Sequence, residues 1–332
     1  MAYQQVGTPR FYVDAISWLK SLGVGNSLTA DIWGFNTSNL YTGEEGGGDR
    51  YFTYTYNSSL TIPYNFVAYL GHTFLSDSSA FDDIGFIINT GDESGEDWIL
   101  PDNDSVEGSV NFNDLGFGGN NGTASFNGFS IVRLQEITEN HHSVGIHVHN
   151  RNDLPYQLGT VVVGSYYDMP HSPDLNLSLS YDYSGVKEIT TRGGASLSNS
   201  FYSKPADWGS LGAWELSDGS TPNQELSRSG RKVWNLSFSY LAQEDTFPKY
   251  DQLNMLATST PDETQPDQYT LQGSDDFYTQ VIHKTNGGQL PFIFQPNKDE
   301  NSFAICKIDS GFSVKLVANG VYNIKMKIRE VW

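Results

Sequence analysis

Apolar and polar side chains alternate along the last segment of the chain, Val321–Trp332. A side-chain period of two, with one apolar and one charged face, is typical of a half-buried antiparallel strand. We therefore predict a strand here, with its apolar face packed on the core. The apolar positions are Tyr322, Ile324, Met326 and Ile328, and the charged positions are Lys325, Lys327 and Arg329.

The same alternation predicts strands at 51–56, 129–137, 144–148, 175–179, 234–240 and 312–316. In the segment 234–240, Tyr240 is expected on the apolar face together with Trp234 and Phe238. Asn319-Gly320 predicts a tight turn into the last strand, because both residues tolerate a positive φ. The polar loop 140–143 separates two of the predicted strands, which we expect to pair with each other as a hairpin.

Two short segments have helical patterns instead. Asp14 is placed to cap a helix over Ala15–Leu22, and Gly23 is placed to end it. Ser274 is a candidate cap for a second helix, 274–285, which has acidic residues in its first turn and ends at Asn286-Gly287-Gly288. We expect both helices to cover sheets rather than to form a helical layer.

The composition agrees with many short strands separated by turns. Aromatic residues make up 14% of the 332 residues, and aromatic and β-branched side chains suit a pleated surface, whereas Gly, Asn, Asp and Ser suit turns. We predict an all-β fold of two β-sandwich-like units, of jelly-roll or galectin type, with one or two short helices.

The two units are predicted to meet near Asp168–Pro173, where two prolines stiffen the chain. Residues 26–168 are expected to form a jelly-roll-like sandwich. Residues 169–332 are expected to form a second β-rich unit that contains the helix 274–285. Residues 1–25 are expected to pack with this second unit.

Charge narrows the classes of partner. With 39 acidic and 19 basic residues the net charge is −20, which disfavours nucleic acids and anionic membranes. The single cysteine, Cys306, lies in an apolar run and is expected to be a buried structural residue without a disulfide. The start of the chain has no signal-peptide pattern, and no apolar run approaches the ~18 residues of a membrane span.

Metal and catalytic motifs are weak. His147 and His149 share one face of a predicted strand, but it is the polar face, which favours ordinary surface residues over metal ligands. The acidic segments 91–97 and 102–108 do not match an EF-hand, which leaves an irregular calcium site or a solvated loop as alternatives. We find no nucleophile elbow, P-loop or dinucleotide fingerprint, and we assign no catalytic, cofactor-binding or metal-binding residue.

Several aromatic residues are candidates for stacking on sugar rings, although such residues more often lie in cores or interfaces. Paired carboxylates of the kind that hydrolyse glycosides also remain open, because acidic residues are plentiful. The aromatic candidates are Trp98, Trp208, Trp214, Tyr166 and Tyr167.

Four segments together resemble structural proteins encoded by tailed bacteriophages of aquatic bacteria, including distal-tail and baseplate-hub proteins. The segments are Gly164–Leu175, Thr191–Leu197, Gly230–Tyr240 and the closing run from Pro291 to Trp332, with a weaker likeness at Gly7–Tyr12. The resemblance implies a ring-forming β-rich part, and often a second β-sandwich of galectin or carbohydrate-binding type. It carries over no functional residues.

The resemblance leads us to expect a non-enzymatic virion protein of the phage tail, folded in the host bacterial cytoplasm. It would form a ring with copies of itself, with a hexamer as the candidate stoichiometry, and connect the tail tube to the hub, the tip or the fibres. The alternative is a β-sandwich that binds or degrades host-surface polysaccharide, with a host glycan as partner. In either case we expect no cofactor.

The basic row Lys325, Lys327 and Arg329 is unusual in so acidic a chain. One interpretation is protection of an edge strand, where lysine discourages unwanted pairing. The other is an interface in which the row meets an acidic surface of a neighbouring subunit and sets the register.

Overall fold

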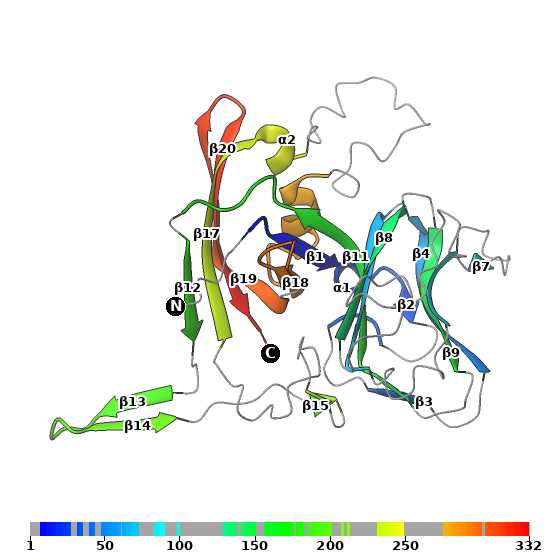
Figure 1. Cartoon of the computed structure of the whole chain (residues 1–332), viewed down its shortest axis with the longest axis horizontal. Helices are drawn as coiled ribbons and strands as arrows, with labels where there is room; N and C mark the ends of the chain where they lie inside the picture. The colour runs from blue at the N-terminus through cyan, green and yellow to red at the C-terminus, as the bar shows by residue number, and fades with distance from the viewer. Residues whose placement is uncertain are drawn as a thin grey trace.

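The computed structural model describes residues 7–27, 32–35, 40–43, 48–60, 62–72, 83–89, 98–99, 129–137, 141–150, 156–175, 177–182, 186–200, 207–208, 211–212, 231–248, 275–300 and 303–331. Strands dominate these residues, and the helices are few and short (Figure 1). The prediction of an all-β, sandwich-like fold is confirmed.

The larger sheet is antiparallel and contains nine strands within the described residues. It joins the N-terminal strand to strands from both halves of the chain, since β1 lies between β18 and β11. In sheet order its strands are β12 (Ser178–Asp182), β17 (Arg231–Ala242), β20 (Val321–Glu330), β19 (Ala304–Ala318), β18 (Phe292–Gln295), β1 (Arg10–Asp14), β11 (Thr160–Asp168), β5 (Tyr64–Leu70) and β8 (Phe129–Ile137).

A second sheet faces the β11–β5–β8 end of the first (Figure 1). Its order is β2 (Asn26–Ser27), β4 (Gly48–Leu60), β9 (His141–Asn150), β6 (Asp83–Asn89) and β7 (Trp98–Ile99). Three two-stranded ribbons pair β3 (Tyr41–Gly43) with β10 (Tyr156–Leu158), β13 (Val186–Thr190) with β14 (Ser196–Ser200), and β15 (Asp207–Trp208) with β16 (Leu211–Gly212).

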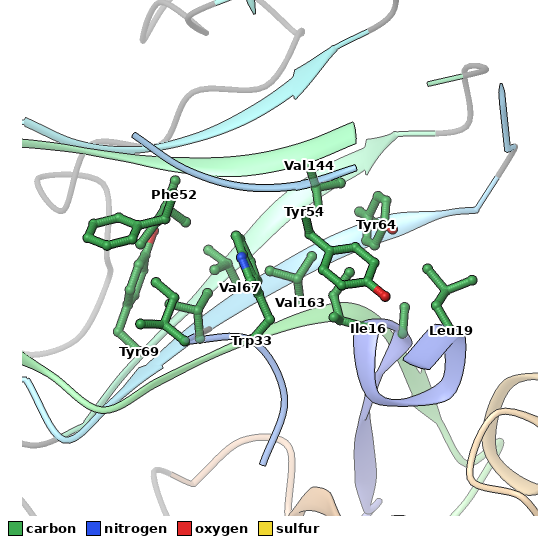
Figure 2. Packing of buried hydrophobic residues seen from close by; sticks show 14 of the residues in the cluster. Ile16, Leu19, Trp33, Phe52, Tyr54, Tyr64, Val67, Tyr69, Val144 and Val163 are labelled. Carbon is green, nitrogen blue, oxygen red and sulfur yellow. The ribbon is translucent and has the colours of Figure 1, made fainter. Parts of the chain in front are cut away.

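The space between the two sheets is filled by one hydrophobic core, to which the helix α1 (Ala15–Leu22) also contributes. Figure 2 shows how Trp33, Tyr54 and Val163 meet there from different segments, with Ile16 and Leu19 of α1 beside them. Fully burying an aliphatic or aromatic side chain contributes about 1.5–3 kcal/mol, so this core is a main source of stability for the sandwich.

A second core lies beside the β17–β20–β19–β18 part of the large sheet. There the π-helical segment η3 (Tyr278–His283) packs Val281 and Ile282 against the sheet, and Phe277 just before it meets Phe11 of β1 edge to face, with ring centroids 5.6 Å apart. Whether 1–25, 26–168 and 169–332 behave as separate units remains a prediction, although the large sheet and its hydrogen bonds run across the boundary at 168.

Several local predictions are confirmed. The helix α1 spans Ala15–Leu22 as expected, with the Asp14 carboxylate accepting from Ile16 N and Gly23 ending it at φ +70°. Asn319 and Gly320 form the two-residue turn between β19 and β20. Cys306 is buried, and so are the predicted inward residues Ile324, Met326 and Ile328 of β20, whereas Tyr322 on the same predicted face is only partly buried.

Three expectations are wrong. The strands β8 and β9 do not form a hairpin, because β8 pairs with β5 in the large sheet and β9 pairs with β4 and β6 in the other. Tyr240 is 79% exposed with φ +63°, because a β-bulge between Phe238 and Leu241 reverses its face.

The third concerns the helix expected at 274–285. Only Tyr278–His283 is regular, and it is π-helical rather than α-helical. The cap is supplied by Asp276, whose carboxylate accepts from Thr279 N and from Thr279 Oγ1 at 2.9 and 2.8 Å. The predicted cap Ser274 lies outside the described residues. The end at Asn286–Gly288 is confirmed, since all three residues have positive φ.

No helix among the described residues is both long enough and apolar enough to cross a membrane.

Candidate functional site

A polar cavity of about 250 Å³ opens where the ladder between β5 and β11 ends. The last paired residues are Phe66 and Gly164, and beyond them the Asn65 side chain replaces the ladder by accepting from Tyr166 N at 2.8 Å. Asn65 sits at a register shift between β5 and β8, a bulge of the kind that re-aims side chains beside binding sites. The cavity is lined by Ser165–Asp168, Asn65, Asp275 and Gln280.

Asp168 forms part of the cavity lining. Its carboxylate accepts from Arg10 Nε at 2.5 Å and from Arg10 Nη2 at 2.8 Å, and Lys298 Nζ approaches it to 3.6 Å. The Arg10 guanidinium also lies 4.1 Å from the centre of the Tyr166 ring, a cation–π contact. These contacts neutralise Asp168 and fix the orientation of Tyr166.

The Lys284 ammonium bonds to two side chains of the cavity lining, and the residue is only 1% exposed. Its Nζ donates to Gln280 Oε1 at 2.7 Å and to Ser165 Oγ at 3.3 Å, and Ser165 Oγ donates to the same Gln280 oxygen at 2.7 Å. A buried cation is costly unless it is paired and hydrogen-bonded, so this network holds the lining side chains in one arrangement.

The lining also includes Asp275, which is exposed and is adjacent in sequence to the buried cap Asp276. Partial burial and the neighbouring Asp276 raise the pKa of Asp275, whereas Lys284 lowers it. Burial, with smaller contributions from Asp245 and Asp275, also raises the pKa of Tyr167, whose hydroxyl donates to the Asp245 carbonyl at 2.8 Å. Tyr167 therefore stays protonated and serves as a rigid wall.

The cavity combines hydrogen-bond donors, hydrogen-bond acceptors and two tyrosine rings in one small space. This chemistry suits binding of a polar molecule. In the part of the chain that the structure describes, no group of three or more His, Cys, Asp or Glu side chains is arranged to hold a metal ion.

Sequence reasoning identified Tyr166 and Tyr167 of this cavity as candidates for stacking on sugars, and the structure brings both to its wall. The structure does not describe the side chains of Trp98, Trp208, His147 and His149, nor Trp214 and the acidic segments 91–97 and 102–108. Sequence reasoning missed Asn65, Gln280 and Lys284. A lysine directly after the segment with the apolar pairs Phe277/Val281 and Tyr278/Ile282 was an available signal.

The basic row lies on the outer face of β20, which is not an edge strand, because β17 and β19 pair with it on both sides. Edge protection is therefore the wrong explanation for these residues. Lys327 pairs with Asp309 at 2.7 Å and Arg329 pairs with Asp182 at 2.6 Å, both within the subunit. Lys325 is exposed, and its register partners on the two neighbouring strands are serines, Ser237 and Ser313.

The second prominent feature is the β13–β14 hairpin, which reaches away from both sheets at the lower left of Figure 1; we call it the arm. Ile189 and Leu197 lie directly opposite each other on the arm and are 63% and 61% exposed. Its loop is well ordered by hydrogen bonds, since Thr191 N donates to Ala195 O at 2.8 Å and Gly194 N donates to Thr191 O at 2.9 Å.

Exposed apolar residues are frequent in the segment that contains β12 and the arm. Nine large hydrophobic residues are exposed in the described part of the chain, and four of them fall between positions 175 and 197. The same stretch contains β12, the edge strand of the large sheet, which pairs only with β17 among the described strands. The four residues are Leu175, Tyr181, Ile189 and Leu197.

Comparison with known proteins gives no family for this chain and a partial similarity to one solved structure. No protein-family model matches the chain, and no curated protein matches it. One solved structure, a GH29 fucosidase from Ruminococcus gnavus in complex with fucose, is similar over 39% of this chain and 20% of its own, at 10% sequence identity and a TM-score of 0.25. The similarity thus spans about a fifth of the fucosidase, and a TM-score this low carries no argument.

Proposed function

We propose that this protein is a non-enzymatic structural protein of a bacteriophage tail, of the distal-tail or baseplate-hub type, which assembles with copies of itself into a ring. The observation that carries the proposal is the arm with its exposed Ile189–Leu197 pair. A two-stranded ribbon is marginally stable in water, so an arm with apolar residues on its surface is expected to be covered by a partner.

The resemblance to phage tail proteins supports this reading from a separate direction. One of the segments that carries it, Thr191–Leu197, forms the loop of the arm and the start of β14. Another, Gly164–Leu175, runs from β11 toward the edge strand β12. Two of the resembling segments therefore lie in or beside the elements that we assign to assembly.

We propose that the partner that covers the arm is a second copy of the chain. The loop of the arm presents the exposed cation Arg192, and a neighbouring copy, with 39 acidic residues, offers carboxylates that can pair with it. Complementary charge of this kind guides association and fixes register. An arm that docks on a different surface of the next subunit makes a head-to-tail contact, and such contacts close into rings when the rotation permits.

In this proposal the ring, with a hexamer as candidate, connects the tail tube to the hub or fibres. The protein folds in the bacterial cytoplasm and ends in the tail of the virion. The edge of β12 offers an additional place for a neighbouring strand to pair, which would also protect that edge.

Light scattering on the purified full chain tests the role of the arm. We expect a ring mass for the unmodified protein and the 36.8 kDa monomer for the double variant Ile189→Asp/Leu197→Asp, which should fold because both positions are exposed. The matched control is Leu316→Asp, 58% exposed on β19, which should still assemble. The proposal fails if the arm variant keeps the mass of the unmodified protein.

A further inference from the structure

The polar cavity between β5, β11 and η3 has no role in the assembly proposed above, and its chemistry indicates a ligand of its own. We propose that it binds one neutral pyranose unit. The inference rests on the size of the cavity, the charges of both signs around it and the kinds of side chain that line it. It does not depend on the proposed function, because binding in the cavity of one subunit does not require a ring.

The volume of the cavity limits the size of the ligand. Pockets for drug-sized ligands measure about 300–1,000 Å³, and this cavity, at about 250 Å³, is slightly smaller. It therefore has room for a single small polar ring and not for an oligosaccharide. Asp275 is exposed at one wall, whereas Ser165 and Gln280 are only 4% exposed, so the cavity extends from an accessible carboxylate to a buried amide.

The charged residues around the cavity limit the charge of the ligand. Asp168 and Asp275 line the cavity, and Asp276 and Asp245 lie next to it. Three cations, Arg10, Lys284 and Lys298, bond to the lining side chains, so charges of both signs surround the cavity. An anionic ligand would meet the two lining carboxylates, and a cationic ligand bound beside Ser165 and Gln280 would be repelled by Lys284, whose ammonium bonds to both of these side chains. A neutral ligand avoids both repulsions and brings no additional charge into the cavity.

The lining side chains then specify the chemistry of that neutral ligand. Each hydroxyl of a sugar both donates and accepts a hydrogen bond, and the cavity offers carboxylate acceptors at Asp168 and Asp275 together with the amides Asn65 and Gln280. Hydrogen bonds to charged groups are the stronger kind, which makes Asp275 the principal contact. The Tyr166 ring, held by Arg10, supplies an apolar surface for the C–H face of the sugar.

Calorimetry on the full chain tests the inference with methyl glucopyranoside, methyl galactopyranoside and methyl mannopyranoside as probes. We expect at least one of them to bind with a Kd on the order of 1 mM, the affinity usual for a small polar ligand of this size. Glucuronate and glucosamine, which carry a negative and a positive charge, should bind at least about tenfold more weakly, because one charge unbalances the site.

Two variants locate the binding. Asp275→Asn should weaken the affinity about tenfold, because it replaces a charged acceptor with a neutral one. Asn65→Ala should weaken it as well, and the thermal unfolding midpoint shows whether each variant is folded. Glu188→Gln makes the same charge change on the arm and should leave the affinity unchanged.

A competition experiment with a soluble polymer of whichever sugar binds then shows whether the cavity recognises a glycan residue or a free sugar. If the polymer competes with the free glycoside, the cavity recognises a residue of a glycan; if only the free glycoside binds, it recognises the isolated sugar. The inference is overturned if none of the three glycosides binds, if the charged sugars bind as tightly as the neutral ones, or if folded Asp275→Asn retains full affinity.

Discussion

Arg10 on β1 lies directly opposite Asp168 on β11, and two hydrogen bonds of 2.5 and 2.8 Å join their side chains. The pair links residues 158 positions apart, and the Arg10 side chain is only 7% exposed. It ties the N-terminal strand into the large sheet and at the same time forms a wall of the cavity. Stability and the candidate site thus depend on the same contact.

Replacing Arg10 by methionine should lower the free energy of unfolding by about 2–3 kcal/mol, because Asp168 then loses its two-point partner in a partly buried place. Urea denaturation measures the change. Lys298→Met is the matched control, since Lys298 approaches the same carboxylate at 3.6 Å with a side chain that is 38% exposed. That control should cost less than about 1 kcal/mol. Equal losses in the two variants would contradict this account.

Asp14 predicts a specific dependence of stability on pH. Burial is the main cause that raises the pKa of this helix cap to about 6, although hydrogen bonds from Ser17 and Ile16 oppose the shift. Because this value lies above the unfolded value of 3.8, the folded state holds the proton more tightly. The contribution is therefore fully present below about pH 4 and is lost as the pH rises through about 6, a loss on the order of 3 kcal/mol.

The variant Asp14→Asn separates this effect from the rest of the titration. Asparagine caps helices about as well as aspartate but does not titrate, so α1 should persist while the fall in stability between pH 4 and 6 becomes shallower. Thermal or urea unfolding at several pH values gives the two curves. If they run parallel, Asp14 is not the group responsible.

Lys325 is the residue of the basic row that is best placed to contact another subunit, since it faces serines while Lys327 and Arg329 have acidic partners of their own. Lys325→Glu should weaken assembly and reduce its dependence on salt, measured by sedimentation at low and high ionic strength. Arg133→Glu, at an exposed position on the opposite edge strand β8, is the control and should have no effect. If assembly of Lys325→Glu depends on salt as strongly as assembly of the unmodified protein, the basic row is not part of the interface.

Sequence patterns predicted those elements whose structure is determined by residues close together in the chain. The helix α1 was predictable because Asp14 and Gly23 satisfy its ends, and β20 was predictable because Ile324, Met326 and Ile328 alternate with charged residues. The partners of β8 and β9 were not predictable in this way, because alternation shows which face is buried but not which sheet a strand joins. The exposed Tyr240 was missed for a related reason, since nothing in the alternation marks the bulge before it.

The cavity was predictable only in part. Tyr166 and Tyr167 stood out as aromatic residues, but Asn65, Gln280 and Lys284 come together only through the pairing of β5 with β11 and the packing of η3 against β11. These contacts join residues more than 100 positions apart, such as Ser165 with Gln280. Their register cannot be derived from a single segment. The arm likewise required the structure, because exposure of Ile189 and Leu197 on paired strands is a property of the fold.

The mass distribution of the purified full chain, measured by mass photometry over a range of concentrations, tests the central claim of assembly most directly. We expect one dominant species at a fixed multiple of 36.8 kDa that does not grow further as the concentration rises, which is the behaviour of a closed ring. A single 36.8 kDa species at every concentration, or a continuous series of ever larger species, would contradict the proposal.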